Sequence, residues 1–177
     1  MVRFLNKSIG ILGGSFDPAH KGHLEISKIA IKKIKIEKLL WVISIKNPFK
    51  NKPFYSLQQR IKKAKIISKN VKKIQVTSLD KTVGSSRSIN LINYLIKKKK
   101  IKNIYFIIGS DNLIEFHKWK SWKKIVKLSK LVVFSRKGYD KKGKKSIVAR
   151  YLKNKIIFIN NKPIHISSTN LRQRKKI

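Results

Sequence analysis

The sequence predicts an α/β fold, a doubly wound and mainly parallel sheet with helices on both faces. Short apolar runs of strand length alternate along the chain with segments of helical periodicity. Two of these runs, 39–43 and 104–108, are continuously apolar, which is typical of strands covered on both faces. The first run ends at Gly13-Gly14, and a helical pattern resumes soon afterwards, as in the first turn of a β-α-β unit.

The first half of the chain can be assigned element by element. A strand at Ile9–Leu12 precedes a helix over Gly22–Lys33, whose apolar face consists of Leu24, Ile26, Ile29 and Ala30. The next expected elements are a strand at Lys38–Ser44, a loop at Asn47–Pro53, a helix N-capped by Ser56 with Leu57, Ile61, Ala64 and Ile67 on its apolar face, and a strand at Lys73–Ser78.

The second half continues the alternation. A helix opened by Ser88 is expected first, with Ile89, Ile92, Leu95 and Ile96 on its apolar face, and then a strand at Ile104–Ile108. Two helices should follow, a short one with Leu113, Ile114 and Phe116 and another with Trp122, Ile125 and Val126. The last expected elements are a strand at Leu131–Ser135, a helix at Ile147–Leu152, a strand at Ile156–Ile159 and an extended piece at Ile164–Ile166. The stretch Lys137–Lys145 holds two glycines and five lysines and is expected to be an exposed, flexible loop. Nothing marks a second domain, so residues 1–177 are expected to form one domain.

Composition limits the classes of function. The chain has no cysteine, which excludes disulfides and thiolate metal sites, and its four histidines and seven acids argue against a protein-built metal cage. The net charge of +38 would suit a nucleic-acid binder, but 38 of the 45 basic residues are lysines spread over every expected helix, which favours a general composition bias. No apolar run approaches the ~18 residues of a membrane span. A cytoplasmic enzyme is therefore expected.

The segment from Ser8 to Ser27 carries the strongest functional signal. Glycines at a strand end let backbone N–H groups approach an anion, and the following helix directs its positive N-terminal end to the same place. His20 and His23, three residues apart, would lie on one side of the first helical turn and could stabilise charge on a phosphate. A lone histidine is more often a local cap, but the glycine pair, the helix start and the paired histidines together favour phosphate binding.

The pattern Gly-Gly-Ser-Phe-Asp-Pro-x-His-x-Gly-His resembles the signature of nucleotidyltransferases with a His-x-Gly-His motif, a superfamily with a Rossmann-like sheet. Three further segments are similar in order and spacing to the nicotinate-nucleotide adenylyltransferases of this superfamily. They are 106–113 with 116–119, then 131–139, and finally Ile166-Ser167-Ser168-Thr169-Asn170-Leu171-Arg172. The resemblance implies transfer of an adenylyl group from ATP to nicotinate mononucleotide, which gives nicotinate adenine dinucleotide and pyrophosphate in NAD biosynthesis.

The resemblance also implies roles for particular residues. His20, His23 and Arg172 would be catalytic; Gly13, Gly14, Ser15, Phe16, Gly109, Asp111, Ser167, Ser168 and Thr169 would bind ATP; Trp119, Lys46, Lys50 and Arg136 would bind the acceptor. Asp111 is also a candidate N-cap of the helix that follows it, and the Ser-Ser-Thr run is an ordinary cap sequence. Trp119 could instead be a core residue, as Trp41 and Trp122 are expected to be. Mg²⁺ would arrive on the phosphates of ATP.

Two departures from the family pattern leave alternatives open. Phe49 stands where the family usually has a histidine, and 85–88 replaces a run that helps recognise the nicotinate ring. The choice between nicotinate and nicotinamide mononucleotide therefore stays open at this point. Phosphopantetheine adenylyltransferase shares the opening motif, although Gly109-Ser110-Asp111 with Trp119 argues against it. A basic nucleic-acid binding module would need clustered arginines, which the sequence lacks. Small nucleotides are the expected partners, without a specific nucleic acid or membrane, and a homo-oligomer is compatible with the sequence.

Overall fold

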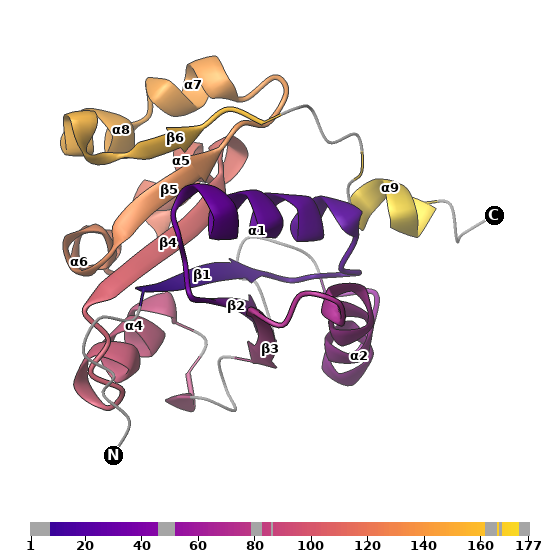
Figure 1. The fold of residues 1–177 in the computed structure, drawn as a ribbon. Helices are drawn as coiled ribbons and strands as arrows, with labels where there is room; N and C mark the ends of the chain where they lie inside the picture. The colour runs from indigo at the N-terminus through magenta and orange to yellow at the C-terminus, as the bar shows by residue number, and fades with distance from the viewer. Residues whose placement is uncertain are drawn as a thin grey trace.

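The computed structural model describes residues 8–45, 52–78, 83–85, 87–161, 166 and 168–173. Within them, six strands form one sheet in the order β3-β2-β1-β4-β5-β6. Every neighbouring pair of strands is parallel. Figure 1 shows the sheet with helices on both sides. The predicted α/β fold with a doubly wound, parallel sheet is confirmed.

The strands lie close to their predicted positions. They are β1 (Ser8–Gly14), β2 (Lys38–Ile43), β3 (Ile74–Ser78), β4 (Asn103–Gly109), β5 (Lys130–Phe134) and β6 (Ile157–Ile159). The α-helices of the described ranges are α1 (Lys21–Lys33), α2 (Leu57–Ser68), α4 (Ser88–Lys97), α5 (Ser110–Glu115), α6 (Trp122–Leu128), α7 (Asp140–Lys144), α8 (Ile147–Leu152) and α9 (Ser168–Gln173). Two 3-10 helices, η1 (Phe116–Lys118) and η2 (Lys153–Lys155), follow α5 and α8. The expected piece at 164–166 lies mostly outside the described residues.

The strand order turns around β1. From β1 the chain builds outward through β2 to β3 and then crosses back to β4 on the other side of β1. Parallel sheets of this kind bind ligands beyond the carboxyl ends of their strands, at the point where the order reverses. The strands on either side of that point, β1 and β4, end at Gly14 and Gly109, and the next strand ends at Phe134. The predicted site segments therefore follow three neighbouring strands.

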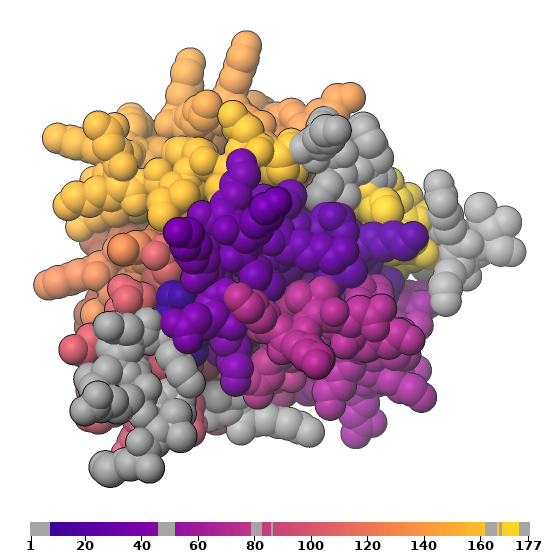
Figure 2. All heavy atoms as spheres, viewed as in Figure 1, coloured from indigo at the N-terminus to yellow at the C-terminus, as the bar shows by residue number. Residues whose placement is uncertain are grey.

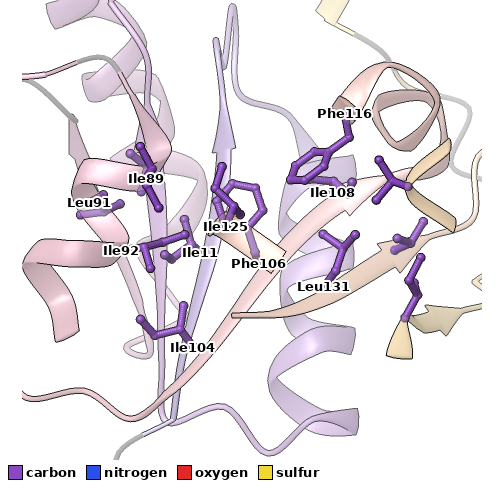
Figure 3. Packing of buried hydrophobic residues seen from close by; sticks show 14 of the residues in the cluster. Ile11, Ile89, Leu91, Ile92, Ile104, Phe106, Ile108, Phe116, Ile125 and Leu131 are labelled. Carbon is purple, nitrogen blue, oxygen red and sulfur yellow. The ribbon is translucent and has the colours of Figure 1, made fainter. Parts of the chain in front are cut away.

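Two apolar clusters cover the two faces of the sheet. On one face, Trp41 and Ile107 pack with Ala30 of α1 and Ala64 of α2. On the other, Phe106 packs with side chains of α4, α6 and α8, and Figure 3 shows Ile11 and Ile125 close to Phe106. Burying a large apolar side chain contributes about 1.5–3 kcal/mol. Covering on both faces explains why the central strands are apolar throughout and not alternating.

The start of α2 follows its predicted cap, whereas its buried line differs from the prediction. Ser56 caps α2 by accepting the N–H of Gln59 at 3.2 Å, as predicted. The predicted apolar face consisted of Leu57, Ile61, Ala64 and Ile67; of these only Ala64 is buried, and the other buried residues of α2 are Arg60 and Ser68. The apolar residues flank this line and are partly buried. A buried arginine in the centre of the line was not predicted.

The loop predicted at Lys137–Lys145 is wrong in part, because its second half forms the helix α7. Gly143 of α7 is buried, and the Asp140 carboxylate accepts the backbone N–H of Arg136 at 3.0 Å. Packing of α7 against α5 overrides a local sequence rich in lysine and glycine. Asp111 is likewise not an N-cap: Gly109 holds the cap position of α5, and Asp111 lies in its first turn.

The excess positive charge lies at the surface. Nearly all lysines of the described ranges are exposed, and the pairs Lys28–Glu25 and Lys118–Glu115 are exposed contacts within single helices. Exposed pairs of this kind contribute about 0–1 kcal/mol each. No helix in the described part of the chain has the length and apolar character needed to cross a membrane.

Candidate active site

The loop after β1 is fixed to the end of β2 and has open space beside Gly13. Gly14 accepts the backbone N–H of Ser44 at 3.0 Å, which fixes the loop to the end of β2. A Cβ added to Gly13 would meet nothing within 4 Å, so the space above this strand end is free. Phe16 adopts a positive φ of 47° and buries its ring against Trp41, with the ring centroids 5.2 Å apart. The loop therefore offers backbone groups to a ligand while one side chain anchors it in the core.

His20 and His23 form a reciprocal cap at the start of α1. Nδ1 of His20 accepts the N–H of Gly22 at 3.1 Å, and Nδ1 of His23 accepts the N–H of His20 at 3.3 Å. The ring centroids lie 3.9 Å apart. A nitrogen that accepts a hydrogen bond carries no proton, so these bonds assign both rings as neutral with the proton on Nε2. In this tautomer each ring carries its one N–H on Nε2, so both imidazoles are hydrogen-bond donors through that atom.

The electrostatic surroundings also favour the neutral form of His20. Burial, and to a smaller extent the positive charge of Arg136, lower the pKa of His20 from 6.5 to about 4. Desolvation disfavours the charged ring, and a nearby cation adds repulsion. At neutral pH, His20 is therefore a neutral hydrogen-bond donor.

The last described helix, α9, docks against the loop that precedes α1. The Ser168 hydroxyl donates to the carbonyl of Pro18 at 3.0 Å, and Nη1 of Arg172 donates to the carbonyl of Asp17 at 2.7 Å. Nη2 of Arg172 also donates to the hydroxyl of Thr169 at 3.2 Å. Figure 2 shows α9, in yellow, against the indigo N-terminal part of the chain. The fold thus brings two segments about 150 residues apart in the sequence to one place.

Asp17 is a buried carboxylate beneath this junction, and sequence reasoning gave it no role. Its two oxygens accept the backbone N–H groups of Phe54 and Tyr55 at 2.8 and 2.9 Å. Nη1 of Arg172 lies 3.6 Å from Oδ2. Asp17 is 5% exposed, so these contacts occur in a desolvated setting in which charged hydrogen bonds are strong. One carboxylate therefore joins the start of α2 to α9.

A second group of polar residues lies at the ends of β4 and β5. Oδ2 of Asp111 forms an ion pair with Nη1 of Arg136, and the N–H of Arg136 donates to the Ser110 hydroxyl at 3.0 Å. Oδ1 of Asp111 is buried without a hydrogen-bond partner among the described residues. A Cβ on Gly109 would lie 2.4 Å from this oxygen, so a larger residue there would force the Asp111 carboxylate to move. The geometry leaves one carboxylate oxygen for a ligand donor.

Trp119 is half-buried at the end of η1. Its ring packs on Phe116, with centroids 4.9 Å apart, and meets Phe106 edge-on. Trp41 is fully buried, as expected, whereas Trp122 is only partly buried and contacts Tyr151. Trp119 thus combines a packed side with an accessible part. Lys46, Lys50 and Ser167 lie outside the described residues.

The arrangement favours binding of a polyphosphate over metal or nucleophilic chemistry. Among the described residues, no group of three or more His, Asp or Glu side chains lies close enough to hold a metal ion. The groups near the end of β1 are hydrogen-bond donors: two Nε2–H groups, the hydroxyls of α9 and a guanidinium. Such donors stabilise negative charge that moves between phosphate oxygens.

Comparison with known proteins identifies the family. The model of the cytidylyltransferase-like family matches residues 11–174. A protein of Pelagibacter ubique named probable nicotinate-nucleotide adenylyltransferase is 53% identical over 167 residues, which cover 93% of this chain and 92% of that protein. A protein of Endomicrobium trichonymphae with the same name is 31% identical over 169 residues, covering 93% of this chain and 84% of that protein.

A solved structure shows the same fold. Plasmodium falciparum nicotinic acid mononucleotide adenylyltransferase complexed with NaAD superposes with a TM-score of 0.75 at 22% identity, covering 95% of this chain and 83% of that chain. A structure of a nicotinate-nucleotide adenylyltransferase from Vibrio parahaemolyticus gives a TM-score of 0.64 at 18% identity, with 94% and 85% covered. The chain therefore belongs to the cytidylyltransferase-like family and, within it, to the nicotinate-nucleotide adenylyltransferases.

Proposed function

We propose that this enzyme transfers the adenylyl group of ATP to nicotinate mononucleotide at the carboxyl ends of β1, β4 and β5. A phosphate oxygen of the mononucleotide attacks the α-phosphorus of ATP, and a new P–O bond forms. The bond from the α-phosphorus to the bridging oxygen breaks, and its electron pair leaves with pyrophosphate. The attacking oxygen is already anionic, so the reaction needs positioning and charge stabilisation more than a strong base.

The observation that carries this proposal is the docking of α9 onto the loop before α1. It sets Arg172 and the hydroxyls of Ser168 and Thr169 beside the loop that leads to the paired imidazoles. We assign His20 and His23 to the α-phosphate and the bridging oxygen, where negative charge develops. Arg172 is assigned to the β- and γ-phosphates, together with Ser167. Neutral imidazoles suit this role because they donate a hydrogen bond and need not exchange a proton.

The two nucleosides are assigned to the outer ends of the site. Backbone groups of the 13–16 segment would lie between the two nucleotides. Oδ1 of Asp111, which lies beside Gly109 and has no partner among the described residues, would accept a hydrogen bond from a hydroxyl of the adenosine ribose. Trp119 would stack on the pyridine ring, since a flat aromatic side chain matches a flat ring. Arg136 would neutralise the acceptor phosphate. The charge of Arg136 acts on His20, which is assigned to the α-phosphate of ATP, and the acceptor phosphate must approach that α-phosphorus to react.

Mg²⁺ fits this site best as an ion carried by ATP. Asp17 is engaged with two amides and Arg172, and Oδ2 of Asp111 is paired with Arg136, so only Oδ1 of Asp111 is left among the carboxylate oxygens of these two acids. Phosphate oxygens would therefore supply its ligands, and the ion would neutralise phosphate charge. Lys46 and Lys50 remain proposed contacts of the acceptor. We also propose that residues 1–177 act as one domain and that the enzyme works in the cytoplasm.

The proposal is tested by comparing acceptors. Purified enzyme with ATP and Mg²⁺ is assayed for pyrophosphate release with nicotinate mononucleotide, nicotinamide mononucleotide or phosphopantetheine. We expect the highest kcat/KM with nicotinate mononucleotide and formation of the corresponding dinucleotide by mass spectrometry. Turnover only with phosphopantetheine, or salt-dependent RNA binding with no turnover of any acceptor, would overturn the proposal.

A further inference from the structure

A buried cation lies beneath the candidate site, and the proposed reaction leaves it without a role. Arg60 is 2% exposed and occupies the buried line of α2 together with Ala64 and Ser68. Charged side chains are almost never fully buried unless partners compensate for the lost hydration. Replacing such a group by a well-packed apolar residue is often neutral or stabilising, so stability alone is a weak reason for its presence.

The guanidinium of Arg60 binds backbone carbonyls of separate segments. Nη1 donates to the carbonyls of Ser15 and Ser44 at 2.8 and 2.7 Å, and Nη2 donates to that of Ile45 at 3.1 Å. Nε donates to the carbonyl of Tyr55 at 3.1 Å. Burial lowers the pKa of Arg60, and the negative charge of Asp17 opposes this effect. Four carbonyls from the loop after β1, the end of β2 and the start of α2 are therefore tied to one rigid, planar group.

Arg60 and Asp17 both hold the backbone of Tyr55. The N–H of Tyr55 donates to Asp17, and the carbonyl of Tyr55 accepts from Arg60. Asp17 in turn receives Arg172 of α9. The geometry thus connects the start of α2 with both the loop after β1 and the last helix.

The bond to Ser15 also fixes the direction of the next backbone donor. In a trans peptide unit, the C=O and the following N–H point in opposite directions. The carbonyl of Ser15 is directed down to Arg60, so the N–H of Phe16 is directed away from α2. The peptide unit after Gly14 is fixed in the same manner, because the Gly14 carbonyl accepts the N–H of Ser44 and the N–H of Ser15 therefore points the other way. The loop's free donors are therefore oriented by contacts made underneath it.

We propose that Arg60 is a positioning residue for adenylyl transfer: it holds the 13–16 loop and the adjoining turns so that backbone donors and the imidazoles face the triphosphate. The inference rests on the proposed role of that loop in binding ATP. Arg60 touches neither substrate. Its effect acts on kcat, because a small displacement of groups that stabilise the transition state costs rate more than ground-state affinity.

The test compares Arg60→Met, Arg60→Lys and the matched control Lys62→Met, which removes an exposed cation from the same helix. Rates of pyrophosphate release are measured below the onset of unfolding, as followed by circular dichroism. We expect Arg60→Met to remain folded with kcat about 100-fold lower and KM for ATP changed much less. Arg60→Lys should lose about tenfold in kcat, since an ammonium is a point donor and cannot replace the planar fork. Lys62→Met should match wild type.

A second readout separates positioning from packing. Arg60→Ala leaves a polar cavity, and millimolar guanidinium should restore part of its kcat, whereas the same concentration of an alkylammonium ion should not. If Arg60→Met or Arg60→Lys is folded and both kcat and KM stay within about twofold of wild type, the inference is overturned. If the methionine variant does not fold, the lysine variant and guanidinium rescue decide the result.

The comparison variant His23→Ala distinguishes the two proposals. Loss of activity in His23→Ala together with full activity in the Arg60 variants would refute only the positioning role. Full activity in His23→Ala would refute the proposed site itself.

Discussion

The two ends of the candidate site hold their charges in different ways. At the end of β1, Asp17 and Arg60 are 5% and 2% exposed. Asp17 binds two adjacent backbone amides, and Arg60 binds backbone carbonyls of several segments. At the ends of β4 and β5, the paired side chains of Arg136 and Asp111 are 52% and 22% exposed. The first end is built into the fold, whereas the second is a half-exposed ion pair on a strand end.

This difference suggests a division of labour. Buried, fully bonded charges cannot rearrange without cost, so they hold neighbouring donors in a fixed geometry, as stabilisation of a transition state requires. A half-exposed ion pair is weak and screened by solvent, so either side chain can leave its partner and bind a ligand at little cost. The end of β1 suits the reacting phosphates, and the ends of β4 and β5 suit recognition of the nucleosides.

The largest expected effect is loss of a donor at the end of β1. His23→Ala and Arg172→Ala should each lower kcat/KM for ATP about 100-fold or more, because a donor to a developing charge contributes about 3–4 kcal/mol. Pyrophosphate release measures the effect. Arg150→Ala, which removes an exposed arginine from α8, serves as the control and should keep wild-type activity. Activity near wild type in both site variants would remove the assigned roles.

The second prediction compares one carboxylate from each end. Asp17→Asn places an NH₂ group against backbone N–H donors in a buried setting and should cost about 1–3 kcal/mol of unfolding free energy. Asp111→Asn breaks only the half-exposed pair and should cost about 0–1 kcal/mol. Urea unfolding measures both values. An equal cost for the two variants would contradict the distinction between the buried charges at the end of β1 and the half-exposed ion pair at the ends of β4 and β5.

The third prediction concerns the acceptor. Trp119→Ala should raise KM for nicotinate mononucleotide about tenfold or more, since stacking of a base on an aromatic side chain contributes about 1–3 kcal/mol. Trp119→Phe should retain most of the affinity. Trp122→Ala is the matched control, because Trp122 is also partly buried but packs on Tyr151. If the two alanine variants change KM equally, Trp119 acts through packing and not through stacking on the acceptor.

The smallest expected effect is a pH dependence from His20. Its ring has a pKa of about 4 in the folded protein, against an ordinary value of 6.5, so the unfolded chain binds more protons between these pH values. The stabilisation by neutral His20 is complete above pH 6.5 and is lost as the pH falls through 4. His20→Asn keeps a cap acceptor without the titrating ring. Its unfolding free energy should fall less steeply in this window than that of wild type, and identical slopes would contradict a neutral His20.

Local patterns were enough to predict most of the fold. The apolar runs at 39–43 and 104–108 predicted two central strands because burial on both faces demands apolar residues throughout. Ser56 predicted a helix start because its hydroxyl accepts an N–H only a few residues away. The motif with His20 and His23 predicted a strand, loop and helix start, and the structure has β1 followed by α1 with His20 as its N-cap. These features depend on neighbours in the sequence, so spacing reveals them.

The features that escaped prediction depend on contacts between distant segments. Arg60 was one basic residue among 45, and its carbonyl partners lie up to 45 positions away. Asp17 stood inside the recognised motif, but its amide partners are 37 and 38 positions further along. The helix α7 forms because it packs on α5, against a sequence that locally favours a loop. Periodicity and composition carry no record of such pairings.

The proposed site requires the imidazoles of α1 and the guanidinium of α9 to act on one triphosphate. A crystal structure with α,β-methylene ATP, a non-cleavable analogue, tests it most directly. We predict that Nε2 of His20 or His23 lies within hydrogen-bond distance of the α- or β-phosphate, while Arg172 contacts the β- or γ-phosphate of the same molecule. A triphosphate bound elsewhere, with Arg172 touching only Asp17 and Thr169, would contradict the account.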